Sequence, residues 1–287
     1  MKRRLVYSVF LLCVLQSSLL ANQNQQDYEQ IEYAVIPIDQ IAQKAVCDSH
    51  EVARGLPIFT HPVTRFPNPY ITTNYAGYVA ADNLDNPTAG SVTAVSGRWI
   101  VPIIVPSDIP NDDFSFWVGI DGIGSSTIEQ IGFGYTKIDV PTYYAWYELF
   151  PAPPVKIIGF PVNPGDVIEA SVVYAGSDVF TMTITNITQN VTYTVPSSEA
   201  TLPGAERKSA EWIVEPLGLV IGELPLADFV IGHLWECTAT INGVTGPIND
   251  PSWQNVPAYM EALTGEQKAI PSVLLQNEAF FVTWKHE

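Results

Sequence analysis

The sequence repeatedly alternates apolar and polar residues with a period of two. The clearest runs are residues 114–121, 180–185, 191–195 and 280–285. This alternation puts neighbouring side chains on opposite faces of an extended strand, so each run has one face for a core and one for solvent. Turn residues such as those at 163–166 separate the runs. Many half-buried strands joined by turns are typical of an all-β fold, and we expect an antiparallel β-sandwich.

One window departs from this pattern. The 23 Pro and 19 Gly residues suit short strands joined by many turns. Residues Pro257 to Lys268, however, have a helical spacing of apolar residues. We therefore expect one short helix there, in an otherwise all-β body.

The excess of acidic over basic residues bears on which kinds of partner the protein can bind. Lys and Arg total 13 against 30 Asp and Glu, a formal net charge of −17. A protein that binds nucleic acid needs a basic face, so we expect no nucleic-acid partner. Charged residues make up only 15% of the chain and apolar residues 47%, which favours a sizeable core over disorder.

The amino terminus has the features of an export signal. Basic residues at positions 2–4 precede the apolar run Leu5–Leu15, and Ala21 is a plausible cleavage residue. The run is too short to span a bilayer well, and no later run reaches about 18 apolar residues. We expect residues 1–21 to be removed, leaving a secreted or periplasmic protein, a monomer with no membrane association.

The remaining chain divides into a leader and a body. Residues 22–69 are rich in Gln and Asn and then broken by Pro, which predicts either a pro-segment or an amino-terminal arm. Residues 70–287 form the β-sandwich domain. In an oxidising compartment Cys47 of the leader and Cys237 of the body could pair.

A metal site has little support. His233 and Cys237 lie four residues apart, a spacing that can present two ligands. No familiar zinc motif is complete, so we expect neither a metal nor a cofactor. The nucleophile elbow, the metalloprotease His-Glu-x-x-His motif and the phosphate loop are also missing from the sequence. Any hydrolysis would therefore depend on carboxylates and amides.

Aromatic and acidic side chains share a face on several predicted strands. Between two of these strands, Gln130 points away from its neighbour Glu129, which we expect to be structural. Aromatic rings beside carboxylates on successive strands indicate a groove for an extended polymer. The residues that share a face are Trp117 with Asp121, Trp146 with Glu148, and Glu211 with Glu215.

Five short motifs occur in an order that resembles the glutamic peptidases, the eqolisin family. Together they span most of residues 70–287. The motifs are Asn74-Tyr75-Ala76-Gly77-Tyr78, Trp117-Val118-Gly119-Ile120-Asp121-Gly122, Ile128-Glu129-Gln130-Ile131-Gly132, Ala145-Trp146-Tyr147-Glu148 and Ala210-Glu211-Trp212-Ile213-Val214-Glu215.

The resemblance implies two curved antiparallel sheets, akin to a concanavalin-like jelly roll, and an acid endopeptidase that cleaves polypeptides without a cofactor. The family's catalytic glutamine matches Gln130 and its glutamate matches Glu211. The glutamate would be a general base that activates water, and the glutamine would stabilise the oxyanion. The substrate-binding residues of the family match Trp117, Asp121, Trp146 and Glu148.

The sequence departs from fungal members at three positions beside these motifs. Tyr144 stands where Asp is usual, Phe150 where Tyr is frequent, and Gly134 where an acidic residue is frequent. Substrate preference and pH optimum therefore do not transfer from the family.

Two other functions fit the same residues. A carbohydrate-binding or glycoside-cleaving sandwich would use Glu148 and Glu211 as acid and base, with Gln130 as a binding residue. A catalytically inactive member of the fold would serve as a binding module.

Overall fold

The computed structural model describes residues 69–109, 112–137, 140–217 and 224–286. The predicted signal segment, Cys47 and all but the last residue of the predicted leader lie outside the described residues. The leader's fate and the pairing of Cys47 with Cys237 therefore stay predictions.

Every regular element in the described ranges is a strand, so the helix predicted at 257–268 is wrong. The window contains most of β14 (Gln254–Glu261), a turn and the start of β15 (Gln267–Pro271). Residues 257–260 of β14 are all buried. A strand covered on both faces loses the alternation of apolar and polar residues, and periodicity alone cannot distinguish it from a buried helix.

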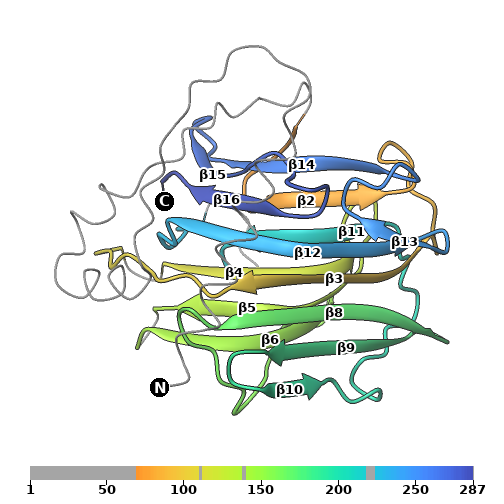
Figure 1. Cartoon of the computed structure of the whole chain (residues 1–287), viewed down its shortest axis with the longest axis horizontal. Coiled ribbons are helices and arrows are strands. Elements are labelled where there is room, and N and C mark those ends of the chain that lie inside the picture. Colours follow the sequence, from red (N-terminus) through yellow and green to blue (C-terminus); the bar gives the residue numbers. More distant parts are fainter. Residues whose placement is uncertain (1–68, 110–111, 138–139, 218–223, 287) are drawn as a thin grey trace. The chain divides into compact units, whose positions relative to one another are not determined.

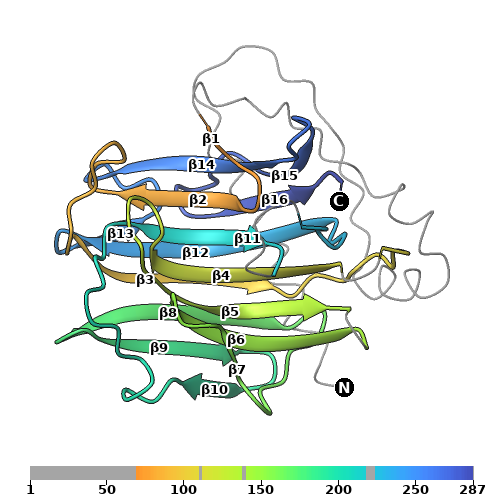
Figure 2. The same ribbon diagram turned by 180° about the vertical axis from the view of Figure 1, so that it is seen from behind.

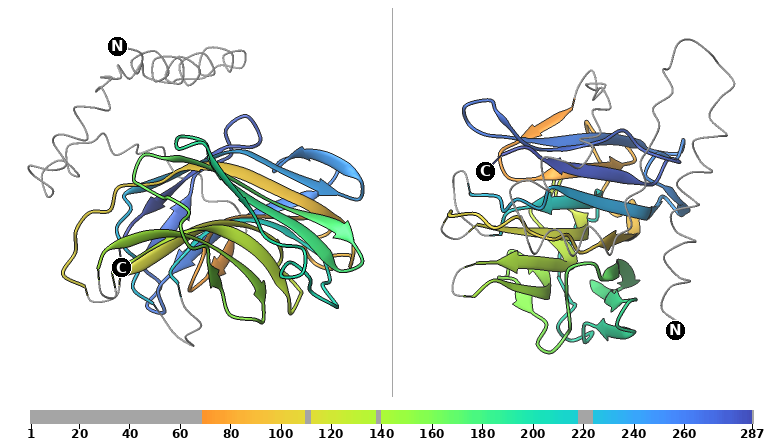
Figure 3. Two further views of the ribbon diagram at one scale, coloured as in Figure 1. Left: turned by 90° about the horizontal axis from the view of Figure 1, so that it is seen from below. Right: turned by 60° about the vertical axis from the view of Figure 1, so that its left-hand side comes forward.

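The strands form two layers that belong to one continuous hydrogen-bonded path (Figure 1). Neighbours along the path are antiparallel. The path runs through one layer, crosses by way of β16, β15 and β14, and continues through the other layer (Figure 3). The first layer consists of β10 (Val191–Thr194), β9 (Val179–Asn186), β8 (Val167–Gly176), β3 (Val92–Ile100), β12 (Ile231–Ile241) and β16 (Phe280–Trp284).

The second layer faces the viewer in Figure 2. In order, the strands of the second layer are β14, β2 (Ala76–Ala81), β11 (Ala210–Glu215), β4 (Asp113–Asp121), β5 (Ile128–Thr136), β6 (Thr142–Phe150) and β7 (Val155–Lys156).

Two short strands lie off the path: β1 (Tyr70–Thr72) pairs with β14 in parallel, and β13 (Val244–Pro247) pairs with β12.

The core lies between the layers and is rich in aromatic rings. Phe116 of β4 stacks on Phe133 of β5, with ring centroids 5.4 Å apart. Trp99 of β3, in the other layer, lies 6.0 Å from Phe133. As the alternation predicts, Phe114, Phe116, Val118 and Ile120 all face this core.

A second apolar cluster lies on the opposite face of the second layer. We call it the outer-face cluster; its buried members are Val79, Trp117, Trp146 and Ile213. Because Trp117 alternates with the core-facing residues of β4, one strand supplies both the core and this face. Five of the six predicted site residues belong to the outer face: Trp117, Gln130, Trp146, Glu148 and Glu211.

Gly132 of β5 should not tolerate a side chain. A Cβ atom there would lie 2.1 Å from the Phe116 carbonyl oxygen of the paired strand. We expect Gly132→Ala to lower the free energy of unfolding by about 3 kcal/mol, the upper end of the usual cost of overpacking. Denaturant unfolding would measure the loss.

Gly159→Ala is the matched control. Gly159 has φ +80° but nothing within 4 Å of its Cβ position, so only backbone strain of about 1 kcal/mol is expected. Equal losses in the two variants would contradict the predicted clash.

Candidate active site

Four neighbouring strands bring three of the predicted site residues into one row. Glu211 of β11 lies opposite Gly119 of β4, Gly119 lies opposite Gln130 of β5, and Gln130 lies opposite Glu148 of β6. Residues directly paired across a sheet point to the same face. The carboxyl groups and the amide therefore share the outer face, on the adjacent strands visible in Figure 2.

Gly119 separates Glu211 from Gln130 and leaves room between them. With strands about 4.8 Å apart, the two backbones are roughly 10 Å apart. The Trp117 ring leans over this position, because its Cζ3 atom lies 2.9 Å from where a Cβ of Gly119 would stand. A small molecule or a peptide group between Glu211 and Gln130 would thus lie against the indole ring.

The Gln130 amide is fixed at one end only. Its Nε2 donates a hydrogen bond to Glu148 Oε2. Its Oε1 is buried and has no hydrogen-bond partner among the described residues. A buried acceptor left unpaired costs about 1–3 kcal/mol. The Oε1 atom is therefore well suited to accept a hydrogen bond from a water molecule or a substrate N–H.

Burial controls the two carboxyl groups of the row. Glu211 and Glu148 are only 4% and 6% exposed. Burial raises the pKa of Glu148, and the hydrogen bond from Gln130 opposes that rise. Burial also raises the pKa of Glu211 to about 8; the Ser209 hydroxyl opposes the rise, and the charges of Glu215 and Asp121 add to it. Both side chains thus hold a proton more tightly than a carboxyl group in water.

Ser209 links Glu211 to the loop that follows β4. Its Oγ donates to Glu211 Oε1 over 3.2 Å and accepts from the Ile123 backbone N–H over 3.1 Å. Gly122 packs against the Glu211 carboxyl, and a Cβ there would lie 2.3 Å from Oε1. Gly122 has φ +118°, a backbone conformation that favours glycine. The glycine of this motif thus lets the loop reach the carboxyl group.

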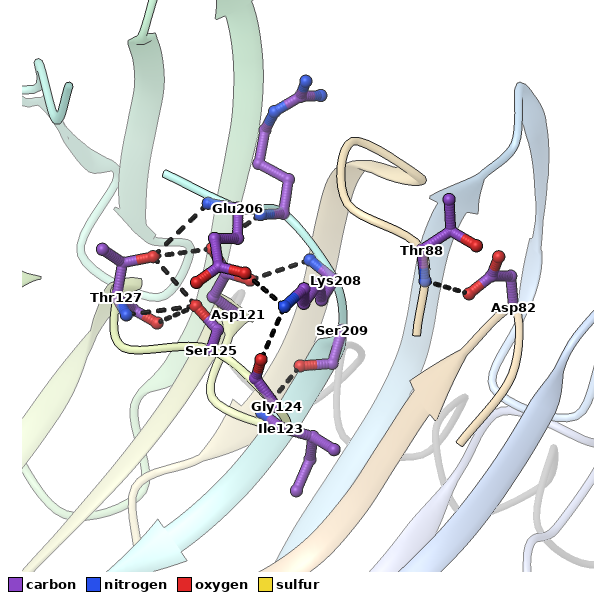
Figure 4. Close-up of polar contacts among 11 residues, drawn as sticks. Asp82, Thr88, Asp121, Ile123, Gly124, Ser125, Thr127, Glu206, Lys208 and Ser209 are labelled. Carbon is purple, nitrogen blue, oxygen red and sulfur yellow. Dashed lines mark hydrogen bonds and ion pairs between the residues drawn. The ribbon is translucent and has the colours of Figure 1, made fainter. Parts of the chain in front are cut away.

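Asp121 braces the same loop from inside the protein. Its buried carboxylate accepts hydrogen bonds from the backbone N–H groups of Arg207 and Lys208, at 2.7 and 2.8 Å, and from the Thr127 hydroxyl at 2.9 Å (Figure 4). Lys208 Nζ also donates to the Gly124 carbonyl at 2.7 Å. These contacts fix the segment that leads into β11. Contact of Asp121 with a substrate stays a prediction.

The two predicted aromatic residues lie in the next row of the outer face. Trp117 and Trp146 are both paired with Gly132, from opposite sides. Trp117 Nε1 donates to Glu215 Oε1 over 2.9 Å, whereas Trp146 Nε1 is buried with no partner among the described residues. Tyr144 lies beside this cluster, with Lys156 Nζ 4.3 Å from its ring centroid. An aromatic surface therefore adjoins the Glu211–Gly119–Gln130 row.

Sequence reasoning did not assign roles to Ser209 or Glu215. Glu215 shares a face with Glu211 by simple alternation, which is the signal that could have identified it. Ser209 precedes β11, and its contact depends on a loop from elsewhere in the chain. By contrast, Glu129 faces away from Gln130 into the protein, as alternation predicts.

Neither a metal centre nor a membrane-spanning helix emerges from the part of the chain that is described. No group of three or more His, Cys, Asp and Glu residues there is arranged to hold a metal ion. His233 instead stacks on the Trp235 and Phe281 rings, and the buried Cys237 thiol donates to the Trp235 carbonyl. No helix of sufficient length and apolar character to cross a bilayer occurs in these ranges.

Comparison with known proteins decides the family. The sequence profile of the Peptidase A4 family matches residues 73–266, about two thirds of the chain. The protein belongs to this family, the G1 eqolisins. This peptidase therefore acts on polypeptides. No curated protein sequence matches the chain significantly.

Solved eqolisin structures share the fold of the peptidase. Scytalido-glutamic peptidase, bound to a transition-state analogue inhibitor, has a TM-score of 0.60 at 22% identity, with 74% of this chain and 98% of that one covered. SCP-B, an eqolisin in complex with a tripeptide, has a TM-score of 0.56 at 21% identity, with the same coverage. Aspergilloglutamic peptidase from Aspergillus niger has a TM-score of 0.50 at 27% identity, covering 61% and 99%. The predicted β-sandwich is thus confirmed.

Glu129 should make the peptidase less stable as pH rises. Neither of its carboxyl oxygens has a hydrogen-bond partner among the described residues, and burial, with the Asp121 charge, raises its pKa to about 9 despite nearby Arg207. The stability gained by protonation is fully present below about pH 4.5 and is lost as pH rises toward 9. Because Gln stays neutral, Glu129→Gln should leave Tm unchanged at pH 4 and raise it at pH 8.

The exposed Glu266 supplies a control of the same chemistry. Glu266→Gln should leave Tm unchanged at both pH values. A Glu129→Gln effect of equal size at pH 4 and pH 8 would show that ionisation of this carboxyl group is not the cause.

Proposed function

We propose that this peptidase is an exported acid endopeptidase that uses Gln130 and Glu211 as a catalytic dyad. The observation that carries the proposal is the register of β11, β4 and β5, which sets both side chains on the outer face on either side of Gly119. The family supports hydrolysis of peptide bonds. The amino-terminal signal pattern supports export to a secreted or periplasmic location.

The two side chains divide the chemistry between them. Peptide hydrolysis needs an activated water, a stabilised oxyanion and a protonated leaving amine. Glu211 takes the proton of the water and returns it to the amine. The Gln130 Oε1 atom holds the water, and the Nε2 proton not used by Glu148 donates to the oxyanion. Trp117, Trp146 and Glu148 bound the site on the substrate side.

The raised pKa of Glu211 bears directly on acid activity. A carboxyl group accepts a proton only when it is ionised, and burial opposes ionisation in acid. The Ser209 hydroxyl and the Ile123 N–H favour the ionised form. We infer that hydrogen bonds from these two donors determine the pH below which activity falls, the acidic limb of the pH profile. These bonds become stronger when the substrate excludes the remaining water.

The geometry does not favour the glycosidase alternative. Glycosidase carboxyl groups lie about 5–9.5 Å apart across the scissile bond. Glu148 and Glu211 are three strand spacings apart in the row. Glu148 also already accepts a hydrogen bond from the Gln130 amide. Membership of a peptidase family also contradicts this reading.

Glu211→Gln tests the dyad most directly. The substitution keeps the shape and removes the proton acceptor, so kcat on a protein substrate at pH 3–5 should fall by at least about 10³. Gln130→Ala should cost about 10²–10³ through loss of one oxyanion donor. Glu266→Gln should retain full activity. A folded Glu211→Gln variant with substantial activity would rule out the assignment.

Ser209→Ala tests how the pKa of Glu211 is set. Loss of the donor to Oε1 should raise that pKa further, so the acidic limb of kcat/KM should move to higher pH. Ser125→Ala is the control, because Ser125 lies in the same loop as Ile123 and, among the described residues, its hydroxyl bonds to Thr127 and not to Glu211. A uniform loss at every pH, with no displacement of the limb, would disprove the role of Ser209.

A further inference from the structure

Glu215 is a partly buried carboxyl group on the outer face, and the dyad chemistry does not explain its use. It is the last residue of β11, on the same face as Glu211. Its Oε1 atom accepts the Trp117 Nε1 hydrogen bond over 2.9 Å. Trp117 is paired directly with Ile213, so Glu215 is its diagonal neighbour across the strand pair. Long and aromatic side chains can make such diagonal contacts.

The orientation of the Trp117 ring matters because of what lies under it. The far edge of the ring, at Cζ3, reaches over Gly119, the residue between Glu211 and Gln130. The opposite side of the indole, at Nε1, is held by Glu215. The second side-chain torsion of an aromatic residue has a broad energy well, so packing and this one bond must fix it. Gly119 has no side chain that could support the ring from below.

We propose that Glu215 is a positioning residue that acts through Trp117, holding the indole ring over Gly119 so that it bounds the reaction space of the dyad. The proposal rests on the proposed function of Gln130 and Glu211. The ring excludes water from one side of that space and supports the substrate backbone on it. A ring free to rotate would neither exclude water nor support the substrate backbone, although every catalytic group would still be present.

The protonation state of Glu215 determines how the bond is made in acid. Burial raises its pKa to about 8; the Trp117 bond opposes the rise, and the charges of Glu148 and Asp113 add to it. Tyr75 and Glu211 also interact electrostatically with Glu215. In acid the side chain is therefore neutral and accepts through an uncharged oxygen. Gln reproduces that acceptor, whereas Leu has a similar size and no acceptor.

Kinetics of four variants test the proposal: Glu215→Gln, Glu215→Leu, Trp117→Phe and the double variant of the last two. With a peptide substrate in acid, Glu215→Gln should keep kcat within about threefold of the wild type. Glu215→Leu should lower kcat about tenfold or more with little change in KM, since it leaves a buried indole N–H without a partner. In the Trp117→Phe background, which lacks the donor, Glu215→Leu should cost less than about threefold more.

Three outcomes would overturn the proposal: full activity of Glu215→Leu, an equal loss from it in the Trp117→Phe background, or a loss in Glu215→Gln as large as in Glu215→Leu. If Glu215→Leu does not fold, Trp117→Phe alone decides the matter. Trp117→Phe should then lower kcat about tenfold or more, and full activity of that variant would disprove the role.

A readout that needs no activity separates this proposal from the proposed function. The indole N–H resonance of Trp117, assigned by its absence in Trp117→Phe, should exchange slowly with solvent in the wild type and in Glu215→Gln. It should exchange at least tenfold faster in Glu215→Leu, while the other indole resonances keep their positions. If the wild type cleaves no peptide, the dyad assignment fails, and this resonance still tests whether Glu215 holds the ring. Unchanged exchange in Glu215→Leu overturns the proposal.

Discussion

The site depends on the pairing register of β11, β4 and β5. Side chains alternate along a strand, so a shift of one residue in any of these strands would carry Glu211 or Gln130 from the outer face into the core. The aromatic core resists such a shift, because Phe116 and Phe133 stack on each other and Phe133 packs against Trp99 of the opposite layer. The same hydrophobic packing that stabilises the sandwich thus also holds Glu211 and Gln130, the proposed dyad, in position.

Buried and partly buried carboxyl groups give the second layer an unusual electrostatic character. Glu211 and Glu215 lie on its outer face and Glu129 on its inner face, and burial raises the pKa of each well above that of a solvated Glu. None of them forms one of the ion pairs found in the described ranges. A layer of this kind carries least charge in acid, where ionisation of Glu211 depends on the Ser209 hydroxyl and the Ile123 N–H.

Much of this arrangement could be predicted from the sequence, because period-two alternation identifies which residues share a face. The alternation put Glu211 and Glu215 on one face, and it put Glu129 on the face away from Gln130. It failed at β14, where burial of both faces removes the alternation. It also could not show that Asp121 braces backbone N–H groups 86 and 87 residues away, or that Ser209 reaches Glu211 through a loop from another strand. Such contacts depend on how distant segments meet, and local patterns do not encode them.

The place of β11 in the sheet has a consequence for how the protein matures. β11 lies between β2 and β4 in the sheet, but in the sequence it follows both of them and also β5 to β10. Glu211 is therefore synthesised 81 residues after Gln130 (211 − 130). Pairings between such distant segments form late in folding. Until β11 lies between β2 and β4, Glu211 has no place beside Gln130, so the proposed dyad is assembled only after residue 211 has been synthesised.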